Sequence, residues 1–140
     1  MQTKLKEAVN KAAKGLWRAF PMLMGTILLI SIISVLVPQS FYTTIFQKNI
    51  ILDSLIGSLI GSISAGNPLT SYIFGGELLN QGVSLIAVTA FVVAWVTVGF
   101  IQFPAEAAIL GKKFAILRNI SAFILAIVAA ILTVLILGVI

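Results

Sequence analysis

The sequence predicts an all-α integral membrane protein with about three full transmembrane helices plus a broken or re-entrant helical hairpin, preceded by an N-terminal amphipathic helix. Of its 140 residues, 60% are hydrophobic and only 9% are charged, whereas a soluble domain is about 25% charged. The length allows roughly three to five spans of about 20 residues each. A Gly-Asn-Pro sequence at residues 66–68 interrupts one apolar segment, which predicts the break.

The composition excludes several kinds of chemistry. The chain contains no cysteine and no histidine, so disulfides, thiolate metal sites and imidazole catalysis are excluded. Its few carboxylates show no paired spacing for acid–base work or metal ligation, and we expect no enzyme activity, no metal and no cofactor. The net charge of +5 belongs to basic residues that flank apolar segments. It predicts contact with anionic lipid and not with nucleic acid.

The first expected element is an amphipathic interfacial helix over residues 1–18. A single transmembrane domain is expected over residues 19–140, and its first span is expected over about 20–37. The basic face suits the headgroup layer of the bilayer. Pro21 is expected in the first turn of the span, where its missing N–H matters little, and Pro38 ends it. The basic residues of this face are Lys4, Lys11, Lys14 and Arg18.

Residues 39–48 are expected to form a short interfacial helix, and about 49–80 to form the broken hairpin. The first half of the hairpin has small residues at three- and four-residue spacing. Small side chains let two helix backbones approach closely, which drives packing in lipid. The residues assigned to helix packing are Gly57, Gly61, Ser58 and Ser62.

The break itself is the expected solute site. Glycine permits positive φ, asparagine tolerates it, and proline lacks a donor and restricts the residue before it. A second half-helix starting near Pro68 would present unpaired N–H groups and a partial positive charge, which suits an anion or the oxygen of a polar solute. The expected solute-binding residues are Asn67, Thr70, Ser71, Gly66, Pro68, Thr97 and Gln102.

Two further spans are expected at 84–103 and 120–140. Glu77 and Glu106 are the carboxylates closest to membrane depth, and intramembrane acids are functional candidates. They are therefore candidates for proton coupling, with an interfacial position as the alternative for each. Asp53 is interpreted as a residue at the start of a helix rather than as a proton carrier.

The basic residues also predict the topology. If the N-terminus is cytoplasmic, eight of the nine basic residues lie inside and only Lys48 lies outside, as the positive-inside rule requires. We therefore expect a protein of the cytoplasmic membrane with a cytoplasmic N-terminus. The sequence is compatible with a hairpin that re-enters, which gives three full spans, and with one that crosses fully, which gives five.

The order of features from Pro38 to Leu137 resembles that of the predicted-permease family that includes the organoarsenical efflux permeases. A glycine-rich helix and a broken segment are followed by a run at 75–84, an Ala-Phe span, an irregular Pro-containing stretch, and an arginine before the last span. The residues of these features are Gly75 to Ser84, Ala90-Phe91, Phe103-Pro104-Ala105, Leu110-Gly111-Lys112 and Arg118.

The resemblance implies a permease fold with its site at the break. Family members usually contain two similar halves and this chain looks like one, which implies assembly of two copies. The family commonly has a Cys-Ser-Cys motif where Asn67-Pro68-Leu69 stands here. Thiol coordination of trivalent arsenic is therefore not expected.

Together these features predict a membrane permease half that dimerises. It would transport a small polar or anionic solute through a site at broken helices near mid-membrane, by rocking of one half against the other. Its expected partners are a second copy, the bilayer and an unidentified solute. The charge bias favours a parallel dimer, whereas inverted halves would favour an antiparallel one. The alternatives are a non-transporting membrane scaffold subunit and a channel.

Overall fold

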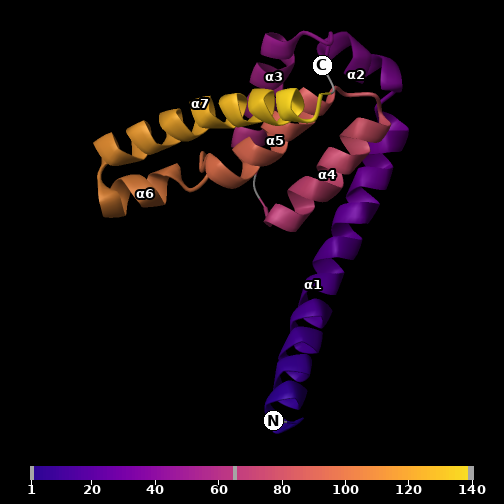
Figure 1. Ribbon diagram of the computed structural model, residues 1–140, viewed down its shortest axis with the longest axis vertical. Coiled ribbons are helices and arrows are strands. Elements are labelled where there is room, and N and C mark those ends of the chain that lie inside the picture. Colours follow the sequence, from indigo (N-terminus) through magenta and orange to yellow (C-terminus); the bar gives the residue numbers. More distant parts are fainter. Residues whose placement is uncertain (1, 65, 139–140) are drawn as a thin grey trace. The chain divides into compact units, whose positions relative to one another are not determined.

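The computed structural model describes residues 2–64 and 66–138, and in these ranges the chain forms seven helices and no strand (Figure 1). The all-α prediction is confirmed. The chain divides into two compact units, Met1–Leu36 and Val37–Ile140. The helices are α1 (Gln2–Leu36), α2 (Gln39–Ile45), α3 (Ile50–Ile63), α4 (Pro68–Asn80), α5 (Leu85–Thr97), α6 (Phe103–Leu110) and α7 (Lys112–Ile136).

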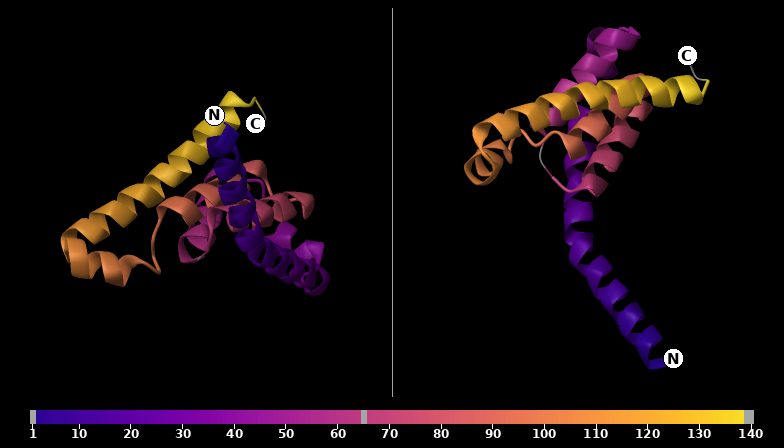
Figure 2. Two further views of the ribbon diagram at one scale, coloured as in Figure 1. Left: turned by 90° about the horizontal axis from the view of Figure 1, so that it is seen from below. Right: turned by 60° about the vertical axis from the view of Figure 1, so that its left-hand side comes forward.

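The first unit is the single helix α1. It runs through the expected boundary at residue 18, because Ala, Lys, Leu and Arg around it are good helix formers. Pro21 therefore lies inside the helix and not in a first turn, so that expectation is wrong. A proline inside a helix removes one backbone hydrogen bond and is a usual cause of a kink. Figure 2 shows α1 changing direction along its length.

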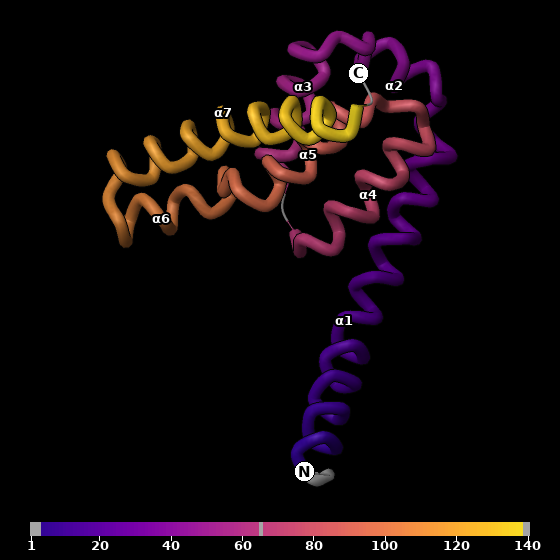
Figure 3. The backbone as a smooth tube through the Cα atoms, viewed as in Figure 1, coloured from indigo at the N-terminus to yellow at the C-terminus, as the bar shows by residue number. Residues whose placement is uncertain are grey.

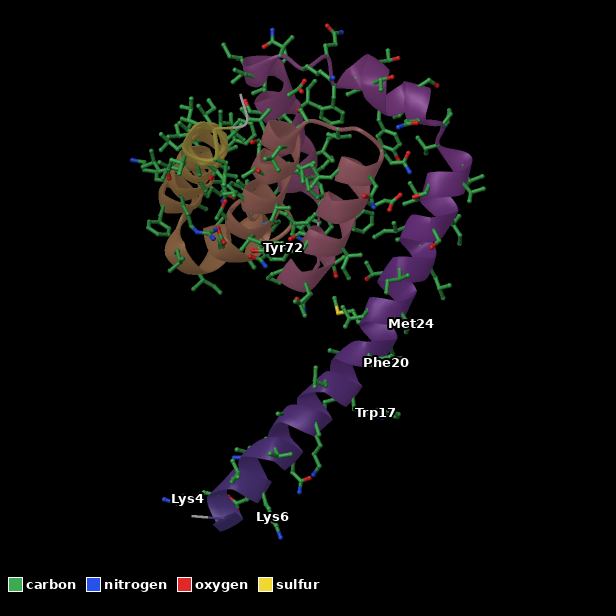
Figure 4. The ribbon with its side chains drawn as sticks, turned by 45° about the vertical axis from the view of Figure 1, so that its right-hand side comes forward. Lys4, Lys6, Trp17, Phe20, Met24 and Tyr72 are labelled. Atoms are coloured by element: carbon green, nitrogen blue, oxygen red, sulfur yellow. The ribbon has the colours of Figure 1, made fainter. Side chains whose placement is uncertain are left out.

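Aromatic residues separate the basic and apolar parts of α1. Lys4 and Lys6 lie near its N-terminal end, and Trp17 and Phe20 lie further along it (Figure 4). The two rings are stacked with their centroids 6.3 Å apart, and both are exposed. Amphipathic rings of this kind prefer the membrane–water interface, so α1 has the order of an interfacial segment leading into a span.

Two helices in the described residues are long and apolar enough to cross a membrane, Lys4–Leu36 and α7. The expected number of about three full spans is therefore wrong. The segment expected at 84–103 forms only the 13 residues of α5, about 20 Å against an apolar thickness of about 30 Å. The last span starts earlier than expected, at Lys112, and the final residues 139–140 lie outside the described residues.

The helical path is broken between α3 and α4. Helix α3 ends at Ile63 and α4 begins at Pro68, where a proline needs no N–H partner. Asparagine caps the start of both helices: Asn49 accepts from two backbone N–H groups of α3, and Asn67 accepts from one of α4. The two pieces have 14 and 13 residues, so each is only about 20 Å long.

Helices α3 and α5 run parallel and in close contact. A Cβ at Gly57 would overlap the carbonyl oxygen of Ala87, and one at Gly61 would overlap that of Phe91. The residue numbers rise together along both helices, which gives the parallel direction. Only glycine allows this approach. The four residues expected to pack helices are all buried here: Gly57, Ser58, Gly61 and Ser62.

Helices α5 and α7 run antiparallel through small side chains. Ala90 packs with Ala130, and Ala94 packs with Ala126; all four are at most 1% exposed. Residue numbers decrease along α7 in the direction in which they increase along α5, which gives the antiparallel direction. Figure 3 shows α5 beside α7, and the chain leaving the helical path before α6. Helix α5 therefore lies at the centre of the second unit, between α3 and α7.

Candidate functional site

A cavity of about 200 Å³ lies where two interruptions of the helical path come together. The first is the break after α3, and the second is the non-helical segment 98–102 after α5. Because α3 and α5 run parallel and have 14 and 13 residues, both breaks fall at the same end of the pair. The lining residues are Ser64, Gly66, Pro68, Trp95, Val96, Val98, Gly99, Phe100, Ile101, Gln102 and Arg118.

A polar network from α6 and α7 holds the second break in place. The backbone N–H of Gly99 donates to Asn119 Oδ1 over 2.9 Å. Asn119 Nδ2 donates to Glu106 Oε2 over 3.2 Å and to the Ala115 carbonyl oxygen over 2.9 Å. Glu106 Oε1 forms an ion pair with Arg118. The network therefore gives a partner to the backbone N–H of Gly99, which lies in the non-helical segment after α5 and has no helical hydrogen bond.

Arg118 supplies the positive charge of the cavity. Its side chain is 37% exposed, against 17% for that of Glu106, so the guanidinium is the member of the ion pair that a solute can reach. The guanidinium has five N–H donors in a planar fork, and Nη1 is the nitrogen that pairs with Glu106. An oxygen-rich solute in the cavity would meet the donors that this ion pair does not use.

An aromatic wall borders the first break. A Cβ on Gly66 would lie 3.2 Å from Cζ2 of the Trp95 ring, and the φ of this glycine is +156°. The indole contacts Phe91 edge-on at 5.3 Å and Phe74 at 5.8 Å between ring centroids. Trp95 Nε1 is buried and has no hydrogen-bond partner in the described part of the chain. The wall of the cavity therefore contains an unsatisfied donor.

Three of the seven residues expected to bind solute line the cavity: Gly66, Pro68 and Gln102. Asn67 stands between two of them but is not part of the lining. Its Oδ1 accepts from the backbone N–H of Leu69 over 3.0 Å, which uses the side chain as the cap of α4.

The other three expected binding residues lie outside the lining. Thr70 and Ser71 are buried in α4, and Ser71 donates to the Pro68 carbonyl oxygen over 2.7 Å. Thr97 is exposed and donates to the Val93 carbonyl oxygen over 2.7 Å. Hydroxyl groups within a helix commonly bond the carbonyl one turn back in this way.

The carboxylates occupy three different environments. Glu106 belongs to the network at the cavity. Glu77 is half-buried on α4, and its Oε1 accepts from Gln81 Nε2 over 2.9 Å. Asp53 lies in the first turn of α3, as interpreted from the sequence, but it is also 0% exposed and accepts a hydrogen bond from Ser84.

Sequence reasoning did not assign Arg118, Asn119 or Trp95 to the site. The adjacent Arg-Asn pair directly before the expected last span was the available signal for the first two, since ionisable side chains close to membrane depth are functional candidates. Trp95 stands inside an apolar run and gave no comparable signal. Its place beside Gly66 depends on the packing of α5.

The comparisons with known proteins agree with a transport role. The model of the ArsP_1 family, described as a predicted permease, matches residues 4–138. No curated protein and no solved structure matches the chain. Together with two long apolar helices, the family match indicates a membrane protein and a transporter rather than an enzyme. The chain therefore belongs to the ArsP_1 family of predicted permeases.

Proposed function

We propose that this chain forms a homodimeric permease that moves a small polar or anionic solute through the cavity between its two helix breaks. The observation on which the proposal rests is the convergence of both breaks and Arg118 on one cavity. Interrupted helices whose ends face a common space are the usual way in which transporters build a solute site within the membrane.

The chemistry of the cavity favours an oxygen-rich solute. Helix α4 begins at the cavity with Pro68, and the positive end of a helix favours negative charge. Arg118 adds a full charge, and the unsatisfied Trp95 N–H adds a donor. The volume of about 200 Å³ is smaller than the roughly 300–1,000 Å³ of pockets for drug-sized ligands. A small oxyanion fits these properties.

The ion pair between Glu106 and Arg118 can be present or broken during the transport cycle. In the resting arrangement Glu106 neutralises Arg118. An anion that enters the cavity competes with Glu106 for the guanidinium of Arg118. Asn119 holds the carboxylate near the break throughout. Solute binding thereby breaks the ion pair, with Glu106 as the carboxylate that responds.

Dimerisation and orientation are parts of the same proposal. Helices α3 to α6 have between 8 and 14 residues, so none of them crosses a layer of about 30 Å alone, and a second copy would complete the walls around them. The basic residues of α1 support a cytoplasmic N-terminus, because basic residues are enriched on the cytoplasmic side of membrane proteins. Light scattering of the purified protein in detergent should give the mass of a dimer, and a monomer mass would contradict this part.

The test is solute flux into proteoliposomes, with labelled inorganic phosphate, sulfate and arsenate as probes. The wild-type protein should give saturable uptake of at least one of them. Arg118→Gln should abolish that uptake. The matched control is Lys113→Gln, which removes an exposed charge from the same helix and should leave uptake unchanged. Arg118→Lys keeps the charge but loses the planar fork, and should raise KM.

A double variant distinguishes loss of the solute site from misfolding of the protein. Arg118→Gln alone leaves the partly buried Glu106 without its cation, whereas adding Glu106→Gln removes both charges and keeps the shape of the Glu106 side chain. The double variant should also lack uptake. Unchanged uptake in either variant would refute the site. Non-saturating conductance would indicate a channel, and no flux of any probe together with a co-purifying membrane protein would indicate a scaffold.

A further inference from the structure

Asp53 is a buried carboxylate at the end of the α3–α5 pair that lies away from the cavity. It is 0% exposed. Its Oδ2 accepts a hydrogen bond from the Ser84 hydroxyl, at the start of α5. Its Oδ1 has no hydrogen-bond partner in the described ranges. If this carboxylate is ionised, its Oδ1 has neither a hydrogen-bond donor in the described residues nor contact with water. Nothing observed next to Oδ1 stabilises a negative charge there.

No cation on the neighbouring helices balances this charge. Helix α5 contains no titratable residue. The charged residues of α7 lie at its N-terminal end, where Asn119 bonds Gly99. The part of α7 that faces the Ser84 end of α5 is its apolar C-terminal half, where Ala130 packs with Ile86.

Other elements near this end contribute three ionisable side chains. Tyr42 on α2 packs against the cluster around Phe46 and Val83. Lys48 precedes α3 and is exposed. Glu77 on α4 accepts a hydrogen bond from Gln81. Over residues 2–64 and 66–138, neither Lys48 nor any other cation forms an ion pair with Asp53.

We propose that Asp53 is a proton-binding site, and that its proton is a coupling ion of the permease. Asp53 lies at the starts of α3 and α5, where the partial positive charge of a helix end offsets only part of the cost of an ionised carboxylate. An ionised carboxylate in an apolar interior without a paired cation is still strongly disfavoured, and a single proton neutralises it. Sodium would need several oxygen ligands, in keeping with the multi-oxygen coordination of hard cations. Ser84 supplies the one side-chain contact observed, and its hydroxyl is used as a donor.

Asp53 lies at the start of α3, whereas the proposed solute cavity lies at the end of the same helix. Asp53 and Ser64 are eleven positions apart on and just after α3, which is about 16 Å along the axis. Gain or loss of the proton changes the charge at one end of the α3–α5 contact, and the solute acts at the other. The coupling role rests on the proposed transport function, whereas proton binding itself does not.

Infrared difference spectroscopy of the full chain in liposomes tests proton binding directly. Titration from acidic to alkaline pH should reveal a protonated carboxyl band that Asp53→Asn removes. Ser84→Ala should shift this band, because it deletes the observed hydrogen bond, and Glu77→Gln should leave it in place. A spectrum that Asp53→Asn does not alter would overturn the proposal. A band that sodium but not potassium removes at constant pH would also overturn it, in favour of a sodium site.

Transport assays then test the coupling role with labelled phosphate as the probe. Asp53→Asn should abolish accumulation driven by a pH gradient but retain phosphate exchange across the membrane at equal pH, since exchange needs no net proton movement. Arg118→Gln should lose both activities. Gradient-driven accumulation that survives in Asp53→Asn would overturn the coupling role. Absence of phosphate transport by the wild type would count against the phosphate site, and the infrared result would still decide proton binding.

Discussion

The close contact between α3 and α5 makes Gly57→Ala the most informative single change for the fold. The added Cβ would lie 2.9 Å from the carbonyl carbon and 3.1 Å from the Cα of Ala87, whereas carbon atoms prefer about 3.5–4.0 Å. These neighbours are backbone atoms of α5, which cannot rotate away. The helices must therefore separate by about half an ångström or more, and overpacking of this kind costs about 1–3 kcal/mol.

The alanine also stabilises the helix relative to glycine, and a matched control variant measures this stabilisation separately. Replacing a glycine inside a helix by alanine stabilises it by up to about 1 kcal/mol. At Gly76 on α4 a Cβ would meet no atom within 4 Å, so Gly76→Ala should show that gain alone. Gly57→Ala should be less stable than Gly76→Ala by about 1–3 kcal/mol. Gly75→Ala should fall between them, because its Cβ would meet only the side-chain tips of Val88 and Val92.

The assay is the free energy of unfolding of the purified protein in mixed detergent micelles, measured for the three alanine variants under one condition. Solute uptake by Gly57→Ala should fall as well, because a displaced α3 moves the first break relative to the second. Equal stability of Gly57→Ala and Gly76→Ala would show that α3 and α5 are not in the close contact described here.

Three further predictions concern single side chains around the cavity. Asn119→Ala should lower the free energy of unfolding by about 1–3 kcal/mol, because Gly99 N–H and one oxygen of Glu106 lose their partner; a stability within error of the wild type would contradict the network. Asn67→Leu should weaken α4 by about 0.5–2 kcal/mol, because it removes the oxygen that caps this helix, whereas Asn67→Ser keeps a capping oxygen and should retain the stability. Trp95→Phe removes an N–H that has no hydrogen-bond partner in the described residues, and should reduce uptake measurably if that N–H binds solute; unchanged uptake would remove it from the site.

The first break could be predicted because its signals are local. Gly66, Asn67 and Pro68 restrict the backbone whatever surrounds them. The second break fell within the span expected at 84–103, whose end Gly99, Gln102 and Pro104 indicated only as irregular, because residues 98–102 are mostly apolar and continue the hydrophobic run. Hydropathy does not record whether a segment is helical. These local signs did not show that α5 ends as early as residue 97.

The residues of the site depended more on tertiary structure. Asn119 bonds Gly99 across 20 positions of the sequence, which requires α7 to fold back antiparallel to α5. Asn67 looked available for solute, but its oxygen serves the cap of the helix that follows. The start of a helix at Asp53 was predictable from its position. Its complete burial was not, because α5 covers it.

The central claim is that the two breaks enclose a water-accessible site, and cysteine accessibility tests it most directly. The chain has no native cysteine, so Ser64→Cys and Ile63→Cys can each be labelled alone in liposomes with a membrane-impermeant thiol reagent. Ser64 lines the cavity, whereas Ile63 is not part of that lining and is 62% exposed as an apolar side chain. We expect Ser64→Cys to react, phosphate or another transported oxyanion to slow that reaction, and Ile63→Cys to stay unlabelled. Equal labelling of both, or labelling of Ile63→Cys alone, would contradict the account.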